Sequence, residues 1–212
     1  MRPILVTGFE PFGGERINPS AEVARAWHGR AIDGAPVIGT VLPCVFGAAI
    51  GALRAAIDTH RPQIVLALGQ AAGRDGFTLE RVAINLDDAR IADNAGAQPI
   101  DAPVVTRGPA AHFTTLPIKA MVAALREAGL AASVSYSAGT FVCNHVFYGL
   151  QHTVKRRRNV RSGFMHLPCL PEQAAKGTPS LPLATMVEGI GIALATALAV
   201  REDLAVSAGR LD

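Results

Sequence analysis

The sequence is poor in cysteine and contains no long hydrophobic run. Its 212 residues include three cysteines, which are too few and too scattered for a disulfide framework, so we expect free thiols in a reducing compartment. Charge, glycine or proline interrupts every apolar run before the roughly 18 residues that a membrane span needs. The first residues pass directly into a strand pattern, without the apolar region of a secretory signal. These features predict a cytoplasmic protein without membrane contact.

The sequence also lacks a strong charge of either sign. Its formal net charge is +3, and the densest basic run, residues 155–161, follows a segment of helical period. Cations near a helix C-terminus are favoured by the helix dipole, which accounts for the run. No aromatic-rich or zinc-finger pattern accompanies it, so we expect no nucleic-acid partner.

Short apolar runs alternate with longer segments of helical period along the chain. This alternation predicts an α/β fold, specifically a single domain over residues 1–212 built as a three-layer α/β/α sandwich around a mostly parallel, twisted sheet. The expected strands are 4–8, 37–43, 63–69, 77–85, 133–139 and 162–168. The expected helices are 18–30, 46–60, 115–129 and 181–200, together with one that begins near Cys143.

Three local signals add detail to this prediction. Asn18 and Pro19 are suited to the N-cap and the first position of a helix, and Gly129 is suited to a helix end. The helix at 181–200 is apolar on almost every side, which predicts deep burial or contact with another subunit. Residues 86–109 show no sustained period, and so long a connection is usually functional or mobile.

A glycine-rich loop follows the first expected strand, in VTGFEPFGGERINPS. It lacks the lysine of a P-loop, and Glu10 stands where a dinucleotide-binding fingerprint needs glycine. Two interpretations of its phenylalanines remain. Phe9 and Phe12 either pack in the core behind a tight turn or line an apolar pocket at the carboxyl end of the strand.

Cys143 lies between an expected strand and an expected helix, in SAGTFVCNHVFYGL. A free cysteine is most often a small buried hydrophobic residue. Near a helix N-terminus, however, unpaired N–H groups and the helix dipole favour the thiolate and can lower the thiol pKa. Cys143 is therefore a candidate nucleophile.

A cysteine nucleophile needs a base, and six histidines are available. His166 closes the expected strand 162–168, which would bring it to the same sheet edge as Cys143. Glu80 interrupts an apolar-leaning strand. It is either an exposed residue of an edge strand or a carboxylate that accepts a hydrogen bond from the imidazole and orients it.

The same region also allows a metal site. Two thiolates and two imidazoles suit tetrahedral zinc, and the sequence offers such a set in Cys143, His145, His166 and Cys169. The C-x-H spacing is unusual for zinc because one intervening residue on a helix points the two side chains apart. In this alternative the protein binds peptide ends without catalysis and carries a structural zinc ion.

Several motifs occur in an order that resembles one known family. They include VTGFEPFGGERINPS, LERVAINLDDARIADNAGAQPID, GPAAHFTTLPIKAMVAALREAG, AGTFVCNH and FMHLPCLPEQ. Together they resemble pyroglutamyl peptidase type I, also called pyrrolidone-carboxylate peptidase. The resemblance implies a cytosolic cysteine exopeptidase, commonly a homotetramer, that removes N-terminal pyroglutamate from peptides through a thioester. It implies no metal and no cofactor.

The resemblance also implies roles for individual residues. Cys143 in TFVCNH matches the nucleophile, His166 in FMHLP the base, and Glu80 in LERVAIN the orienting acid. Gln70 matches the position expected to hydrogen-bond the lactam ring of the substrate. The residues implied to form the substrate pocket are Phe9, Phe12, Gln70, Arg90, Ile91, Phe141 and Val142. Tyrosine would also be expected at position 141, and Cys44 and Cys169 match no role.

Overall fold

A seven-stranded sheet forms the middle layer of the computed structural model, which describes residues 1–157 and 159–209. In sheet order its strands are β2 (Ala31–Ile32), β3 (Ala35–Leu42), β1 (Ile4–Phe9), β4 (Ile64–Gln70), β9 (Arg161–Leu167), β5 (Phe77–Glu80) and β8 (Ala132–Ser135). The central pairs β3–β1, β1–β4 and β4–β9 are parallel. The pairs β2–β3 and β9–β5 are antiparallel.

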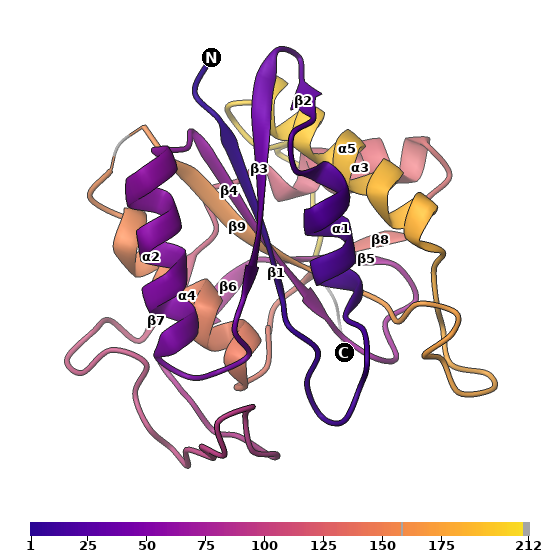
Figure 1. Cartoon of the computed structure of the whole chain (residues 1–212). Coiled ribbons are helices and arrows are strands. Elements are labelled where there is room, and N and C mark those ends of the chain that lie inside the picture. Colours follow the sequence, from indigo (N-terminus) through magenta and orange to yellow (C-terminus); the bar gives the residue numbers. More distant parts are fainter. Residues whose placement is uncertain (158, 210–212) are drawn as a thin grey trace.

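Helices cover both faces of this sheet (Figure 1). One face carries α1 (Pro19–Trp27), α3 (Ile118–Glu127) and α5 (Leu183–Ala199), and the other carries α2 (Ala48–His60) and α4 (Val142–Val154). The three-layer α/β/α architecture with a mostly parallel sheet, predicted from the alternating pattern, is therefore confirmed.

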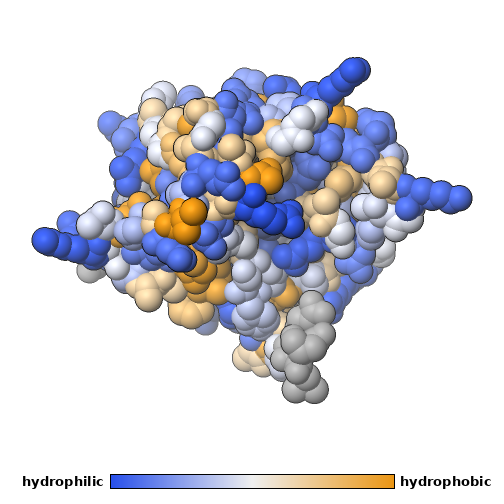
Figure 2. Space-filling model, turned by 90° about the horizontal axis from the view of Figure 1, so that it is seen from below, coloured by the Kyte–Doolittle hydropathy of each residue, from blue (hydrophilic) through white to orange (hydrophobic). Residues whose placement is uncertain are grey.

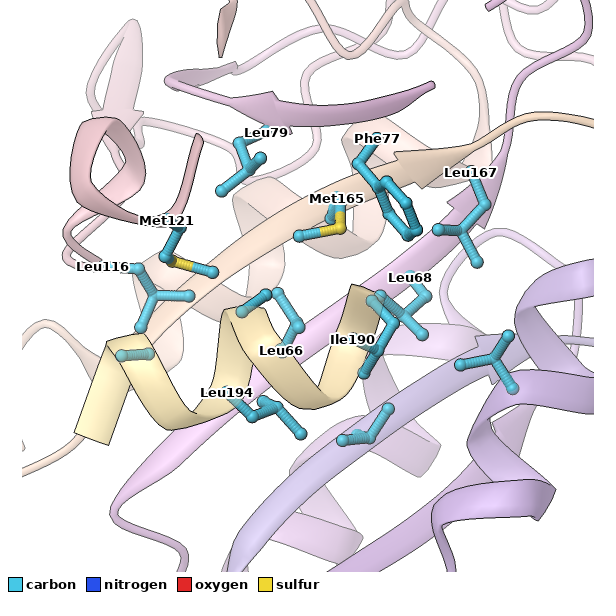
Figure 3. Packing of buried hydrophobic residues seen from close by; sticks show 14 of the residues in the cluster. Leu66, Leu68, Phe77, Leu79, Leu116, Met121, Met165, Leu167, Ile190 and Leu194 are labelled. Atoms are coloured by element: carbon cyan, nitrogen blue, oxygen red, sulfur yellow. The ribbon is translucent and has the colours of Figure 1, made fainter. Parts of the chain in front are cut away.

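Strand alternation divides the core into two layers. On β4, Leu66 and Leu68 face α3 and α5, whereas Val65 and Ala67 face α2 and α4. Figure 3 shows the first layer, where α5 lies across the side chains of β4, β9 and β5. On β9, Met165 belongs to this layer and Phe164 to the other. Because successive side chains alternate between faces, His166 shares the α4 face with Phe164.

The helix ends follow their local sequence signals. Asn18 caps α1, since its side-chain Oδ1 accepts a hydrogen bond from the Ser20 N–H at 3.0 Å, and Pro19 is the first helical residue. Gly129 follows α3 with a φ of +78°, a conformation that suits glycine. The apolar helix α5 is buried along one face through residues such as Met186, Ile190 and Leu194. No helix in residues 1–157 or 159–209 is long and apolar enough to cross a membrane.

The expected strand 77–85 is wrong as a single element. It ends at Glu80, and β6 (Val82–Ile84) leaves the sheet to form a separate antiparallel ribbon with β7 (Ala111–Phe113). The break falls at Arg81, whose guanidinium lies 5.5 Å from the ring centre of Tyr136 rather than in the sheet. Apolar residues lie on both sides of Glu80 and Arg81, so composition alone does not show that the two halves form separate strands.

The connection from β6 to β7 is held in place by local hydrogen bonds. Asp87 and Ala102 form an isolated antiparallel bridge. The carboxylate of Asp93 accepts hydrogen bonds from the N–H groups of Phe46, Ala95 and Ala97 at 2.8 to 2.9 Å. These contacts tie the connection to the segment that precedes α2.

Candidate active site

Three candidate residues, Gln70, His166 and Cys143, lie at the end of the sheet where β4 and β9 finish. The two strands are parallel, with Gly69 opposite His166 and Gln70 opposite Leu167. Cys143 is the second residue of α4, which packs on the same face of the sheet as His166. Ligands of open α/β sheets bind at this edge.

Glu80 reaches His166 from the neighbouring strand. Strand β5 runs antiparallel to β9, with Thr78 opposite His166 and Glu80 opposite Phe164. Glu80 is therefore the diagonal neighbour of His166 on the same face, and diagonal pairs lie within reach of long side chains. The His166 Nδ1 and Glu80 Oε1 atoms are 2.8 Å apart. The interpretation of Glu80 as an exposed edge residue is wrong, since its side chain is completely buried.

This hydrogen bond decides which ring nitrogen of His166 can take a proton. An ionised carboxylate only accepts hydrogen bonds, so Nδ1 carries the hydrogen and donates it to Glu80. The Nε2 atom then remains as the acceptor on a residue that lines a pocket with Cys143. The Arg74 guanidinium lies 3.7 Å from the same Glu80 oxygen.

Cys143 is half-buried at the start of an uncapped helix. The N-cap residue Phe141 provides no side-chain hydrogen bond to the first turn, which leaves backbone N–H groups there for an anion. Burial raises the pKa of the Cys143 thiol, and the charges of Cys44 and Glu80 act in the same direction. A helix terminus contributes only about 0.3–1 kcal/mol, less than one pKa unit. The helix N-terminus therefore does not outweigh the effect of burial on this pKa.

A pocket of about 430 Å³ connects these groups. Its walls contain seven of the predicted residues, namely Phe12, Gln70, Arg90, Ile91, Phe141, Cys143 and His166. The walls also include Glu15, which the sequence did not single out. Figure 2 views this end of the molecule and shows hydrophobic patches surrounded by hydrophilic side chains. Two larger hollows elsewhere contain neither thiol nor imidazole, so volume alone does not identify a site.

Two predicted pocket residues lie behind the pocket walls. Phe9 is buried and packs against Phe164, with ring centres 6.4 Å apart. Val142 is completely buried in the layer beneath α4. Phe12, in contrast, lines the pocket and lies 5.8 Å from the Phe141 ring. The two interpretations of the first loop thus divide between its phenylalanines, one in the core and one in the pocket.

His145 makes contacts that exclude it from the zinc set. Its Nδ1 lies 2.8 Å from Asp87 Oδ2, and its Nε2 accepts the Gly47 N–H at 2.8 Å. Cys169 accepts a hydrogen bond from Gln70 at 3.4 Å. Within the part of the chain that the structure describes, no three Cys, His, Asp or Glu residues gather as metal ligands. The four-residue zinc site is therefore wrong.

Sequence reasoning missed residues that support the site. Asn144, beside the nucleophile candidate, bonds both the N–H and the C=O of Ile84 and so ties α4 to β6. Gln173 approaches Gln70, with Nε2 3.5 Å from its Oε1. Asn144 and His145 were visible next to Cys143 in CNH, but their partners lie 58 to 98 residues away in the sequence, which no local pattern reveals.

Comparison with known proteins gives a consistent result along the whole chain. A family model described as pyroglutamyl peptidase matches residues 2–200. The pyrrolidone-carboxylate peptidase of Cupriavidus taiwanensis is 58% identical and covers 100% of both chains, and that of Erwinia tasmaniensis is 56% identical over 99% of each.

Solved structures agree with these sequence matches. Pyroglutamyl peptidase I from Bacillus amyloliquefaciens has a TM-score of 0.94 at 45% identity, covering 97% of this chain and 99% of that one. Pyrrolidone carboxyl peptidase from Thermococcus litoralis has a TM-score of 0.94 at 37% identity, covering 98% and 100%. The chain belongs to the pyroglutamyl peptidase family and is a hydrolase of the cysteine peptidase class.

Proposed function

We propose that the protein is an exopeptidase that removes N-terminal pyroglutamate from peptides, with Cys143 as nucleophile, His166 as base and Glu80 as orienting acid. The observation that carries this proposal is the 2.8 Å contact between His166 and buried Glu80, beside a pocket that Cys143 and His166 both line. The names of the relatives support the substrate, and the carboxylate, imidazole and thiol support the reaction type.

Acylation begins from a neutral thiol, because burial raises the pKa of Cys143. His166 Nε2 takes the thiol proton as the sulfur attacks the pyroglutamyl carbonyl carbon, and the developing imidazolium is stabilised by Glu80. Backbone N–H groups in the first turn of α4 stabilise the negative oxygen of the tetrahedral intermediate. The amide C–N bond then breaks, the leaving amine takes the proton from Nε2, and a thioester remains on Cys143.

Deacylation repeats these steps with water as the nucleophile. His166 takes a proton from water, the hydroxide adds to the thioester carbonyl, and the C–S bond breaks to release pyroglutamate. The proton on Nε2 then returns to the sulfur, so the enzyme regains its starting state. No metal or cofactor takes part in these steps.

The composition of the pocket matches the chemistry of a lactam. Pyroglutamate is compact and uncharged at its ring nitrogen, so it needs apolar walls and few polar groups. Phe12, Ile91 and Phe141 supply the apolar walls, and Gln70 supplies an amide that can pair with the ring amide. A substrate with a free, charged N-terminal amine would lose its hydration against these apolar walls.

The connection between β6 and β7 supports the specificity for chain ends. Arg90 and Ile91 from this connection line the pocket, and the Asp88 C=O accepts a hydrogen bond from Thr140, two residues before α4. We propose that the connection covers the pocket and admits only the flexible N-terminus of a peptide. Shortening the connection at residues 95–98 should then broaden the range of substrates, whereas an unchanged range would contradict a covering role.

The test is hydrolysis of a pyroglutamyl-linked fluorogenic amide compared with the prolyl and glutamyl amides. We expect selective cleavage of the pyroglutamyl amide that iodoacetamide abolishes and a chelator leaves intact. Cys143→Ala should fold normally and show no turnover. Cys44→Ala provides the matched control, since Cys44 is also a free cysteine but does not line the pocket. Appreciable turnover by Cys143→Ala would remove Cys143 from the proposed role.

The assembly and location of the enzyme belong to the same proposal. We propose a homotetramer, supported by the exposure of large apolar side chains such as Phe113 (66%) and Tyr136 (43%). Light scattering at micromolar concentration should give four times the chain mass, and a monomer would contradict the assembly. All three cysteines are free, which supports a reducing, cytoplasmic location.

A further inference from the structure

Gly69 occupies the point of the sheet that lies beneath Cys143. It is the second-last residue of β4 and pairs with His166 across the parallel ladder. Val65 and Ala67 of the same strand face α4, so position 69 faces α4 as well, because strand side chains alternate. Gly69 is therefore beside the candidate base and under the candidate nucleophile.

A side chain at this position has no space. A Cβ atom built on Gly69 would lie 2.8 Å from the Cys143 Sγ and 2.8 Å from the Phe164 ring. Both distances are shorter than any ordinary carbon contact, so even alanine would force both groups to move. The sulfur thus lies directly against the bare backbone of β4.

Backbone conformation does not explain the glycine. Gly69 lies within a regular parallel ladder and has no positive φ, unlike glycines such as Gly13 and Gly129. Glycine in a strand interior destabilises the strand because it loses more backbone freedom on folding and packs no side chain. What position 69 requires is therefore space and not an unusual backbone angle.

We infer that Gly69 is a positioning residue for catalysis. Because it has no side chain, it leaves the space in which the Cys143 sulfur lies beside His166. This inference rests on the proposed roles of Cys143 and His166. With a side chain in this space the sulfur would move away from the sheet, because at Gly69 the backbone of β4 is held by its ladder with β9. Such a shift would lengthen the path of the thiol proton to the imidazole, and a misplacement of about 1 Å can cost roughly 100-fold in rate.

Kinetics separate this role from a purely structural one. The new methyl group of Gly69→Ala would also clash with the Phe164 ring. Replacing Phe164 by leucine removes the ring atoms that this methyl group would meet. The informative comparison is therefore the double variant Gly69→Ala/Phe164→Leu against Phe164→Leu alone. We expect the double variant to lose about 100-fold in kcat with KM changed less than about threefold, and to react more slowly with iodoacetamide. Equal kcat and equal alkylation rates in the two variants would overturn the inference.

Gly163→Ala is the matched control for crowding within the sheet. Gly163 lies on the neighbouring strand β9. A Cβ at this position would lie 2.6 Å from Thr114 Oγ1 and 2.8 Å from a Leu116 methyl carbon, and so would not meet Cys143. This variant should lower the melting temperature and keep the kcat of the parent protein. A kcat loss as large as that of the position 69 variant would make crowding in general the cause, and the inference would fail.

A stability measurement tests, without any substrate, whether the space at Gly69 accommodates the Cys143 sulfur. Gly69→Ala should lower the melting temperature less in a Cys143→Ala background than in the parent protein, because the shorter side chain removes the sulfur that the new methyl group meets. An equal drop in both backgrounds, or failure to fold in both, would mean that Gly69 does not serve Cys143. Since this comparison needs no turnover, it remains decisive even if pyroglutamyl amides are not cleaved.

Discussion

Replacing Glu80 by glutamine should separate the orientation of His166 from the stabilisation of its charge. Glutamine has nearly the same shape and can still accept a hydrogen bond from Nδ1, but it lacks the negative charge. Two unit charges about 4 Å apart interact by about 4 kcal/mol at an effective dielectric constant of about 20. The imidazolium that forms during thiol attack loses this stabilisation. We therefore expect Glu80→Gln to lower kcat about 1000-fold.

The structure contains a matched control for this variant. Asp87 and His145 form a second buried carboxylate–histidine pair with the same 2.8 Å separation, and neither residue lines the pocket. Each substitution, Glu80→Gln and Asp87→Asn, should reduce the free energy of unfolding by about 1–3 kcal/mol. Only Glu80→Gln should affect turnover strongly, while Asp87→Asn should stay within about tenfold of the parent rate.

Steady-state kinetics with a pyroglutamyl amide and urea unfolding of both variants make the comparison. A Glu80→Gln enzyme within tenfold of the parent kcat would refute the reasoning about charge stabilisation. An Asp87→Asn enzyme that loses as much turnover as Glu80→Gln would show that disruption of buried pairs, rather than the charge beside His166, causes the loss.

Three further predictions concern titratable groups. Burial raises the pKa of Cys143, so its thiol should be neutral at pH 7. The difference in thiolate absorbance near 240 nm between the protein and Cys143→Ala should therefore appear only in alkaline solution. A difference at pH 7 would indicate a resting thiolate–imidazolium ion pair. Burial and the nearby charges of Asp93 and Glu10 raise the pKa of Cys44 from 9.0 to about 12. Above pH 9 the unfolded chain releases this proton first, so stability should fall toward pH 12 by up to about 1.4 kcal/mol per pH unit, and Cys44→Ala should show a shallower fall in melting temperature. Burial alone would raise the pKa of Asp93, but hydrogen bonds from backbone N–H groups, that of Phe46 foremost, outweigh it and lower the pKa below 3.8. Its stabilising effect is present above that pH and lost in more acidic solution, so Asp93→Asn should be less stable at pH 7 and less sensitive to acid below pH 4; equal acid sensitivity would count against the carboxylate.

Local sequence information was sufficient for the layered architecture and for most helix ends, but not for the break between β5 and β6. The cap at Asn18, the end after Gly129 and the alternation on β4 each depend on residues close together in the chain. Short-range sterics and hydrogen bonding control such features, so they can be read from a window of a few residues. Cys143 and His166 were located in the same way, as residues at the ends of predicted elements.

Which of these residues come into contact, and how deeply they are buried, was decided by the tertiary structure. Glu80 reaches His166 because β5 runs antiparallel to β9, a pairing of residues 86 positions apart that no local pattern encodes. The pKa of Cys143 rises because distant segments remove its water, against the direction that its helix position suggested. The sequence by itself thus determined which chemical groups are present and on which elements they stand. Their distances, burial and charge environment depend on contacts between distant parts of the chain, because electrostatic energy and packing follow separation in space and not separation in sequence.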